Sequence, residues 1–240
     1  MNLPTDRKID TVIAATWPAK SIQQIGPITV RFGGGGQRAR AATAQGDVQP
    51  GDIANVETAT RDTGETLFRI RGWEGDLDQM LDGLGYEKRD PTYILAGAVA
   101  GIAARDLPRV SAFTIWPPLA IMDELWIENG VDQERLDNMA RVAGPKIGIL
   151  GRGSDQPGGV GFAAVHDGIA MIHAVAVSPH LRRQKIAENM MISAGKWAQD
   201  IGAEWVATLC TRQNSAALSL YESLGMTVVG EYHYRAKKTT

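Results

Sequence analysis

The segment Val175–Met191 constrains the fold of this chain more than any other, because it orders three elements. β-branched residues at Val175 and Val177 lead into a loop with two arginines, Arg182 and Arg183, and then into apolar residues at helical spacing. A strand, a loop and a helix in that order place free backbone N–H groups and positive charge at a helix start, where a pyrophosphate can bind. The alternative interpretation of the two arginines is solvated surface charge.

A second segment follows about thirty residues after this loop. Asn214–Met226 has helical composition and ends at Gly225, a suitable helix terminator. In this order and at this spacing, the two segments resemble the signature segments of the GNAT superfamily of acetyl-CoA-dependent N-acetyltransferases. The resemblance covers residues 146–235, extends in weaker form back to residue 110, and fades before that.

Composition excludes several other classes of protein. The chain has 240 residues, 44% of them hydrophobic and 22% charged, and a net charge of -2, so no global attraction to nucleic acid or membranes is expected. The single cysteine, Cys210, lies in an apolar run and is interpreted as a buried structural thiol. No apolar run is long enough to span a bilayer, the N-terminal residues lack a basic-then-apolar signal pattern, and no residues have metal-ligand spacing. We expect a cytoplasmic protein without a metal.

The order of predicted elements indicates the fold class. Residues 1–27 read as an irregular arm, residues 46–64 as a polar loop with some strand, and the glycines at 33–36 as a flexible loop. From residue 110 onward the pattern is strand, helix, helix, three strands, helix, strand, helix, strand. This order predicts a mixed α/β fold, with a mostly antiparallel sheet flanked by helices, and matches the GNAT acyl-CoA N-acyltransferase fold.

The chain divides into two predicted domains, residues 1–96 and residues 97–240. A short repeat relates them, since Leu81–Tyr86 resembles Tyr221–Met226 and both stretches join a helix to a strand through glycine. Such joints also recur by chance. If the duplication is real, the first domain is a degenerate GNAT-like copy with a structural or substrate-shaping role, because it lacks the arginine loop and has Leu81 in place of Tyr221.

The resemblance implies a set of residues that bind acetyl-CoA. The family's loop pattern aligns Arg182 with its first position, Lys185 with its glycine and Ala187 with its last position. Lys185 is therefore a departure, which adds bulk where the glycine lets the backbone approach phosphate and also adds positive charge. Asn214 matches an asparagine that contacts the cofactor arm, although helix capping explains it equally well. The implied set is Val175, Ala176, Val177, Arg182, Arg183, Gln184, Lys185, Ile186, Ala187, Asn214 and Ala217.

Two residues are candidates for proton transfer. Tyr221 matches the tyrosine that many family members use as a general acid toward the coenzyme A thiolate, and a phenol has a pKa near 10. The alternative is a core tyrosine. His173 resembles a histidine of arylalkylamine-type members and is the candidate general base, with water as the other possibility. Strand alternation places His173 on one face with Val175 and Val177. Glu204, His166 and His233 are weaker candidates.

The sequence contains few indications of which residues bind the acceptor substrate. The resemblance places the acceptor near Trp116, Asp123 and Trp126, where an acid could meet an ammonium and an indole could stack on a cation. A solvated acid and a core tryptophan are the alternatives. We expect direct attack of a small-molecule primary amine on acetyl-CoA by a monomer or homodimer. The rivals are a non-catalytic acetyl-CoA-binding or structural module and a protein acetyltransferase that acts on lysines or N-termini.

Overall fold

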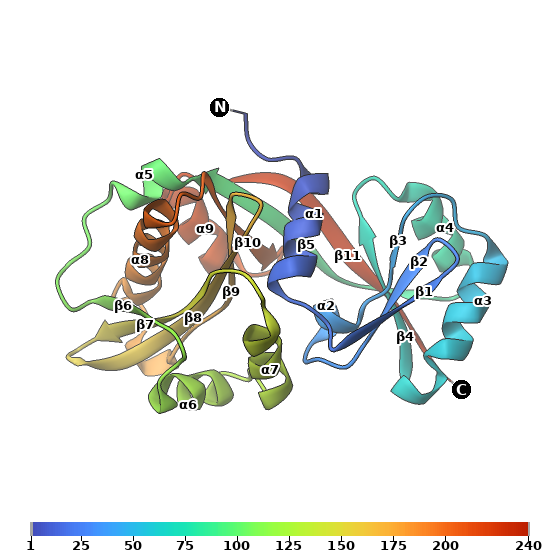
Figure 1. The fold of residues 1–240 in the computed structure, drawn as a ribbon, viewed down its shortest axis with the longest axis horizontal. Coiled ribbons are helices and arrows are strands. Elements are labelled where there is room, and N and C mark those ends of the chain that lie inside the picture. Colours follow the sequence, from blue (N-terminus) through green and yellow to red (C-terminus); the bar gives the residue numbers. More distant parts are fainter. Residues whose placement is uncertain (1, 240) are drawn as a thin grey trace.

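A single eight-stranded sheet runs through the molecule in the computed structural model, which describes residues 2–239 (Figure 1). All neighbouring strands are antiparallel except β9 and β10. The predicted mixed fold with a mostly antiparallel sheet is confirmed. In spatial order the strands are β4 (Glu65–Arg71), β11 (Thr227–Lys238), β5 (Glu87–Ala98), β10 (Trp205–Thr211), β9 (Ile169–Val177), β8 (Gln156–His166), β7 (Lys146–Gly153) and β6 (Ala112–Ile115).

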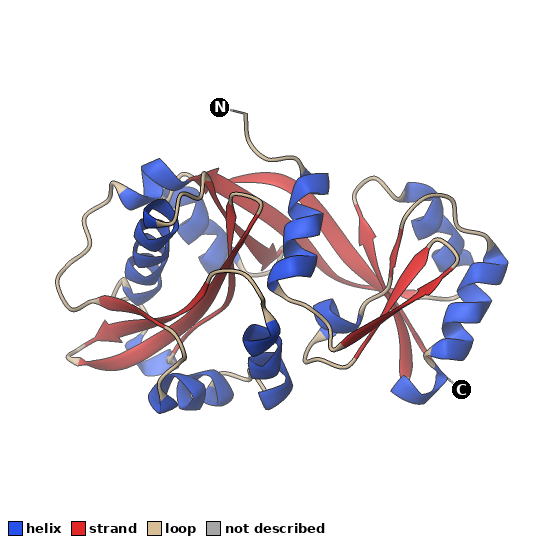
Figure 2. Cartoon of the chain, in the orientation of Figure 1, coloured by secondary structure: helices blue, strands red, loops and turns tan. Residues whose placement is uncertain are grey.

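Helices cover both faces of this sheet (Figure 2). α8 packs on β6 to β10, together with α5 and α9, while α1 and α6 pack on the opposite face over β8 and β9. A second sheet, β1-β2-β3, lies with α3 and α4 in the N-terminal half. The remaining strands are β1 (Ser21–Ile25), β2 (Ile28–Phe32) and β3 (Thr43–Ala44), and the helices are α1 (Asp6–Thr16), α2 (Gln37–Arg40), α3 (Pro50–Ala59), η1 (Arg61–Thr63), α4 (Gly75–Gly83), α5 (Val99–Ala103), α6 (Ala120–Glu128), α7 (Gln133–Arg141), η2 (Pro179–Leu181), α8 (Ile186–Asp200) and α9 (Ser215–Ser223).

The elements of the C-terminal half follow the predicted pattern. In α8 the apolar stripe begins with Ile186, Met190 and Ala194, all buried, and ends at Ile201, which is 41% exposed. α7 begins at Asp132, whose side chain caps the helix by accepting a hydrogen bond from the backbone N–H of Arg135 at 3.0 Å. Such local signals are sufficient to predict these elements from sequence, because each element buries one regular face.

The prediction of an irregular N-terminal arm was wrong. Residues 6–16 form α1, which starts at the side-chain cap Thr5. Its buried residues Ile9, Val12, Ile13 and Thr16 recur at the spacing of one helix face. The prolines on either side of this helix flank it and do not interrupt it. α1 therefore connects the N-terminal half to the C-terminal half by packing on β8, β9 and β11.

The polar stretch at residues 46–64 was also assigned wrongly. It contains α3, with Pro50 at the first helical position, where a missing N–H costs nothing. Only Ile53 and Val56 of this helix are buried. Two apolar residues give too little periodicity to separate a helix from a polar loop in sequence.

The two halves are related by a structural repeat with a constant shift of 140 residues. The unit β4, α4, β5 spans residues 65–71, 75–83 and 87–98, and the unit β10, α9, β11 spans residues 205–211, 215–223 and 227–238. The strand pairing follows the same shift, since Trp205 pairs with Ala98 and Glu65 with Lys238. The same shift also places α3 within the span of α8.

Each repeat unit inserts its last strand into the other half. β5 lies between β11 and β10, and β11 lies between β4 and β5. The two strands pair reciprocally, because Thr227 faces Ala96 while Ala236 faces Glu87. The proposed boundary between residues 96 and 97 falls inside β5.

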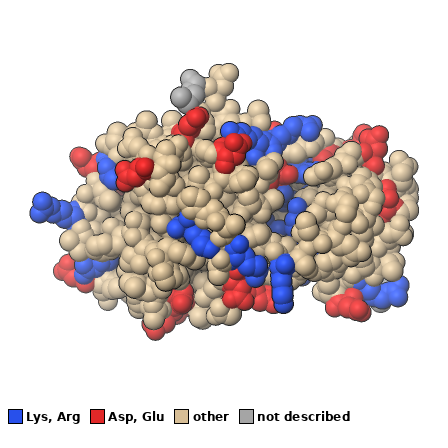
Figure 3. Space-filling model, in the orientation of Figure 1, with Lys and Arg blue, Asp and Glu red and all other residues tan. Residues whose placement is uncertain are grey.

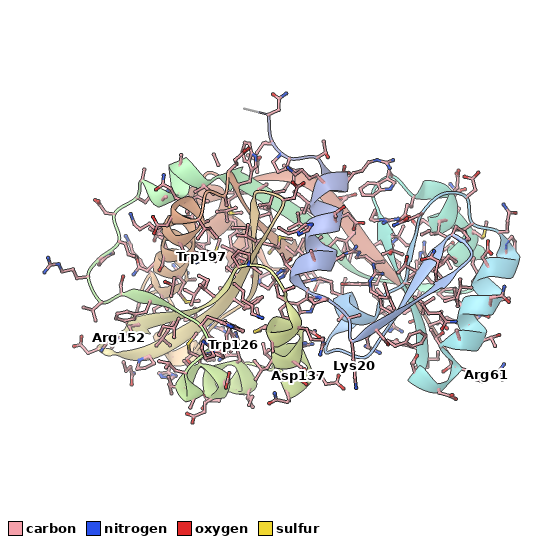
Figure 4. The ribbon with its side chains drawn as sticks, in the orientation of Figure 1. Lys20, Arg61, Trp126, Asp137, Arg152 and Trp197 are labelled. Atoms are coloured by element: carbon pink, nitrogen blue, oxygen red, sulfur yellow. The ribbon has the colours of Figure 1, made fainter. Side chains whose placement is uncertain are left out.

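The four glycines at 33–36 form a close contact between the halves, and the flexible loop expected from them was wrong. Gly34 and Gly35 are buried against α7, and the Asn138 side-chain amide donates a hydrogen bond to the Gly35 carbonyl at 3.0 Å. A Cβ on Gly35 would lie 2.5 Å from the backbone nitrogen of Arg135. Figure 4 marks Lys20, which precedes β1, and Asp137 of α7 near this junction.

We expect Gly35→Ala to lower the free energy of unfolding by about 1–3 kcal/mol, because a backbone atom cannot move aside for the new methyl group. Gly51→Ala in α3 is the matched control: nothing lies within 4 Å of its Cβ position, and alanine favours the helix. Urea unfolding of both variants tests this. Equal stability of the two variants would show that the junction is not tightly packed.

Candidate active site

The defining feature of the C-terminal half is the separation of β9 from β10. The two strands pair in parallel only from Ile169 with Trp205 to Ile172 with Thr208. Beyond that point β10 continues along β5, and β9 continues along β8. The segment Ala174–Val177 thus has a backbone edge without a strand partner on the β10 side. Such an edge can pair with an extended ligand.

A bulge in β9 causes the separation. The register with β8 shifts between Val160 and Phe162, and Ala174 has the left-handed φ of 49°. The Ala174 carbonyl accepts a hydrogen bond from Trp126 Nε1 at 3.0 Å. An extra residue in a strand reverses the alternation of side chains beyond it.

The prediction that His173 shares a face with Val175 and Val177 was wrong for this reason. Val175 and Val177 pack toward the α8 face, as Ile172 does. His173 lies on the opposite face, against Trp17 and Phe162. The bulge therefore separates the histidine from the valines on the two sides of the sheet.

The start of α8 has the properties of an anion site. Lys185 occupies the cap position without a side-chain cap, and within the described chain the N–H groups of residues 186–188 have no hydrogen-bond partner. Arg182, Arg183, Gln184 and Lys185 are exposed around them, whereas the Ile186 side chain is buried. Free N–H groups, a helix dipole and three cations together attract phosphate.

The loop backbone explains the glycine of the family pattern. Lys185 has a φ of 60° and Arg183 one of 66°, both in the left-handed region that glycine adopts without cost. The departure at Lys185 therefore adds backbone strain of about 1–2 kcal/mol as well as charge. Arg182 and Gln184 are anchored, since the Arg182 Nε donates to the Val177 carbonyl at 3.5 Å and Gln184 accepts from Ser154 at 2.9 Å.

Tyr221 of α9 is buried, with 5% of its surface exposed, near the point where the strands part. Burial raises the pKa of Tyr221 to about 12, and the neighbouring Thr208 hydroxyl opposes that rise. Thr208 itself donates to the carbonyl of Ile172, at the last paired position of β9 and β10. Ala217 lies one helical turn before Tyr221, and its N–H is capped by the Asn214 side chain at 3.2 Å. The phenol therefore stays protonated across the neutral range.

His173 is held by residues of the N-terminal half. Arg38 Nη1 lies 2.8 Å from its Nδ1, and Thr16 Oγ1 lies 2.9 Å from its Nε2. An arginine only donates, so Nδ1 accepts; the Thr16 hydroxyl donates to the Val12 carbonyl and therefore accepts from Nε2–H. Burial and the Arg38 charge hold the pKa of His173 well below its usual range. The ring is neutral, and both of its nitrogens are engaged.

Comparison with known proteins agrees with this geometry. Residues 131–226 match the sequence model of the acetyltransferase (GNAT) family. Residues 131–226 therefore form a GNAT acetyltransferase domain. The protein is thus an acyltransferase, as the sequence predicted.

Proteins similar to this chain match it over almost its whole length. The uncharacterized N-acetyltransferase YobR of Bacillus subtilis is 27% identical over 244 residues, which cover 97% of this chain and 98% of the relative. A GCN5-related N-acetyltransferase from Kribbella flavida has a TM-score of 0.72 at 16% identity, over 96% and 94% of the two chains. A tandem GNAT protein from the clavulanic acid biosynthesis pathway has a TM-score of 0.62 at 11% identity, over 97% and 88%. The two structures establish the shared fold.

The other predicted site residues of the GNAT protein are dispersed. Trp126 is fully buried between α6 and the sheet, on the face opposite Trp197 of α8 (Figure 4). Asp123 lies on α6, and burial raises the pKa of its carboxyl group. Trp116 is half-buried and stacks near Phe162, with the Lys146 ammonium 4.8 Å from its ring. The structure brings only Trp116 and Trp126 into one cluster with His173's aromatic neighbours.

The weaker base candidates lie elsewhere. His166 and Glu204 are exposed at the paired end of the sheet, away from the separation of β9 and β10. His233 on β11 is bonded to Asp78 at 2.7 Å. Cys210 is buried, as predicted, with its thiol toward the carbonyls of Thr211 and Asn214, and burial raises its pKa.

The repeat-related place in the N-terminal half lacks the features of a cofactor site. A pocket of about 720 Å³ lies there, between residues 44–49 and α4. Arg71 is one of the residues that line it, and its side chain bonds the Ala44 carbonyl, Asp10 and Glu74. At the start of α3, Pro50 removes one N–H group and Asp52 accepts from the N–H of Gln49 at 2.9 Å. This half has no phosphate loop and no tyrosine at the position of Tyr221.

Sequence reasoning missed Thr16, Trp17 and Arg38. Arg38 lies 135 residues from His173 in the chain, and Thr16 lies 157 residues from it. Only the two arginines in the short helix after the glycines were available as a signal. Within residues 2–239, no group of three or more His, Cys, Asp and Glu side chains could hold a metal ion. No helix in this range has the length and apolar character to cross a membrane.

The lowered pKa of His173 predicts acid-dependent stability. The folded protein keeps this ring neutral where the unfolded chain, with a pKa near 6.5, takes up a proton. Its stabilising contribution is complete above pH 6.5 and falls below it by up to about 1.4 kcal/mol per pH unit. Urea unfolding from pH 7.5 to 5.0 should show a weaker pH dependence for His173→Gln than for wild type.

The exposed His166 provides the control for this measurement, and His166→Gln should keep the wild-type pH dependence. Parallel stability curves for His173→Gln and wild type would mean that His173 titrates alike in the folded and unfolded states.

Proposed function

We propose that this protein transfers an acetyl group from acetyl-CoA to the primary amine of a small molecule, by direct attack of the amine. One observation supports the proposal: the open backbone edge of β9, the uncapped start of α8 and the buried Tyr221 all lie near the point where β9 and β10 part. Each of the three parts fits a different portion of an acyl-CoA molecule.

The residues present fit the cofactor. The N–H groups of residues 186–188, with Arg182, Arg183 and Lys185, would hold the pyrophosphate. The edge of Val175, Ala176 and Val177 would pair with the amide-containing pantetheine arm. Ala217, in front of Tyr221, is a small residue that leaves room beside the arm, and Asn214 is engaged as a cap.

Proton transfer is divided between the two ends of the reaction. Acetyl-CoA supplies the acetyl group as a thioester, whose sulfur must leave with a proton. The Tyr221 hydroxyl provides that proton, because its pKa of about 12 keeps it protonated at working pH. The amine must give up its own proton before it attacks. Water is the better acceptor, since Arg38 occupies the Nδ1 lone pair of His173 in this structure.

The covered acceptor face favours a small molecule over a protein. α1 packs on β8, β9 and β11, and α6 packs on β8 and β9, so helices lie over this face on both sides of His173. The charges on the face seen in Figure 3 are mixed in sign and form no broad acidic groove for a basic peptide. A cytoplasmic location and a monomeric or homodimeric state stay predictions.

Tyr221→Phe should lower kcat by about 10- to 100-fold and leave the Kd for acetyl-CoA nearly unchanged, because only the donated proton is lost. Steady-state kinetics with an amine panel and calorimetric titration with acetyl-CoA measure the two quantities. Tyr93→Phe is the matched control, since Tyr93 is a half-buried tyrosine on β5, which β10 separates from β9. An unchanged kcat for Tyr221→Phe would remove this residue from the mechanism.

The loop assignment makes a separate prediction about affinity. Arg182→Ala should raise the Kd for coenzyme A about 3- to 10-fold, because one phosphate contact is lost.

Comparison of Lys185→Ala with Lys185→Gly separates the effect of the lysine's charge on coenzyme A binding from the effect of its backbone conformation. Both remove the ammonium, but only glycine relieves the strain at a φ of 60°. We expect Lys185→Gly to bind coenzyme A more tightly than Lys185→Ala, and equal Kd values for wild type and Arg182→Ala would contradict the assignment.

A further inference from the structure

Three buried polar atoms without a hydrogen-bond partner stand out in the described chain, and all three lie at one junction. They are the Gln37 side-chain oxygen, Arg38 Nε and Arg141 Nε. α2 and α7 meet here across the glycines, since the Ala39 Cβ and Arg141 Nη2 both lie within 3.2 Å of the Cβ position of Gly34. Buried polar atoms are nearly always satisfied, so this cluster calls for an explanation.

The two arginines also lack a carboxylate partner. Neither Arg38 nor Arg141 forms an ion pair with any described residue. By contrast, the charges of the buried Arg69 and Arg71 are both balanced by an ion pair with Asp10. A guanidinium keeps its charge at any relevant pH, and a half-buried charge without a counterion is unfavourable. The junction is therefore short of negative charge.

The free edge of Arg38 has a definite shape. Nη1 is engaged with Nδ1 of His173 at 2.8 Å. Nε and Nη2 make no hydrogen bond within the described chain, and together they form one side of the guanidinium plane. Two parallel N–H groups on one side match the two oxygens of a carboxylate.

We propose that the amine acceptor also carries a carboxylate, as an amino acid does, and that Arg38 binds this carboxylate with Arg141 as a second positive charge. The inference rests on the proposed acetyl transfer. Arg38 touches His173, so a molecule held by Arg38 has its amine close to the parted strands. The rings of Trp17, Phe162 and Trp116 form a row on the same face, with successive centroids 6.3 and 5.6 Å apart. Phe162 is fully buried and Trp17 is 6% exposed, so the half-buried Trp116 is the ring that can contact an apolar side chain.

The decisive experiment uses wild-type protein and matched acceptor pairs. Each pair is an amino acid and its carboxamide, which keeps the amine and side chain but removes the negative charge. With saturating acetyl-CoA, we expect kcat/KM for the amino acid to exceed that for the carboxamide by about 10- to 100-fold. Because this comparison needs no variant, it holds even where a substitution disturbs folding.

Variants then assign the selectivity to a residue. Arg38→Gln should remove the preference by raising KM for the amino acid about 10- to 100-fold, with KM for the carboxamide unchanged. Arg38→Lys keeps the charge but not the paired N–H groups, and it should recover only part of the preference. Arg61→Gln, at an exposed position in η1 on the far side of the N-terminal half, is the control.

The possible results separate the two proposals. Equal kcat/KM for amino acids and carboxamides in wild type would overturn the carboxylate inference and leave acetyl transfer in place. A preference that survives in Arg38→Gln would overturn the role of Arg38. Absence of acetylation with every amine, despite binding of acetyl-CoA, would overturn the proposed function, and this inference would fall with it.

Discussion

The site depends on one constraint in the sheet: β9 cannot stay paired with both β8 and β10 beyond Ile172. The left-handed residue Ala174 turns the strand toward β8, and Trp126 secures the turn by bonding the Ala174 carbonyl. The open edge, the direction in which the loop leaves for α8, and the side of the sheet that His173 occupies all follow from this bulge. Trp126 thus acts on the site from within the core, by fixing the backbone that a ligand would meet.

The N-terminal half serves the site through its position and has no cofactor cleft of its own. Arg71 lines its repeat-related pocket and bonds the Ala44 carbonyl, and Pro50 removes one N–H group from the start of α3. Around His173, the N-terminal half contributes Thr16 at the end of α1, Trp17 directly after it, and Arg38 of α2. In the proposed mechanism, the C-terminal copy of the repeat binds the cofactor, and the N-terminal half faces the acceptor.

The C-terminal half could be predicted from sequence because its elements are long and each buries one regular face, as in α8. α1 and α3 were missed because they bury only short apolar stripes between prolines and polar residues. The Arg182–Lys185 loop could be recognised because its residues are adjacent in the sequence. Arg38 could not be linked to His173, because the two residues are 135 positions apart and meet only in the folded chain. Strand alternation failed at Ala174, because a bulge has no reliable mark in a run of alanines and valines. The glycines at 33–36 suggested mobility, although they are needed for close packing.

The exchange of β5 and β11 also sets an order of events during synthesis. β4 leaves the ribosome early, yet its neighbour in the large sheet, β11, follows every other strand in the chain. β10 and β11 in turn depend on β5, which must wait through more than a hundred residues of translation for both partners. Nascent chains usually fold domain by domain from the N-terminus. The N-terminal half of this protein cannot complete its strand pairing in that way, because β4 and β5 pair with strands from the end of the chain. Its sheet is completed in a late step that joins both halves at once, and until then the edges of β4 and β5 need protection from aggregation.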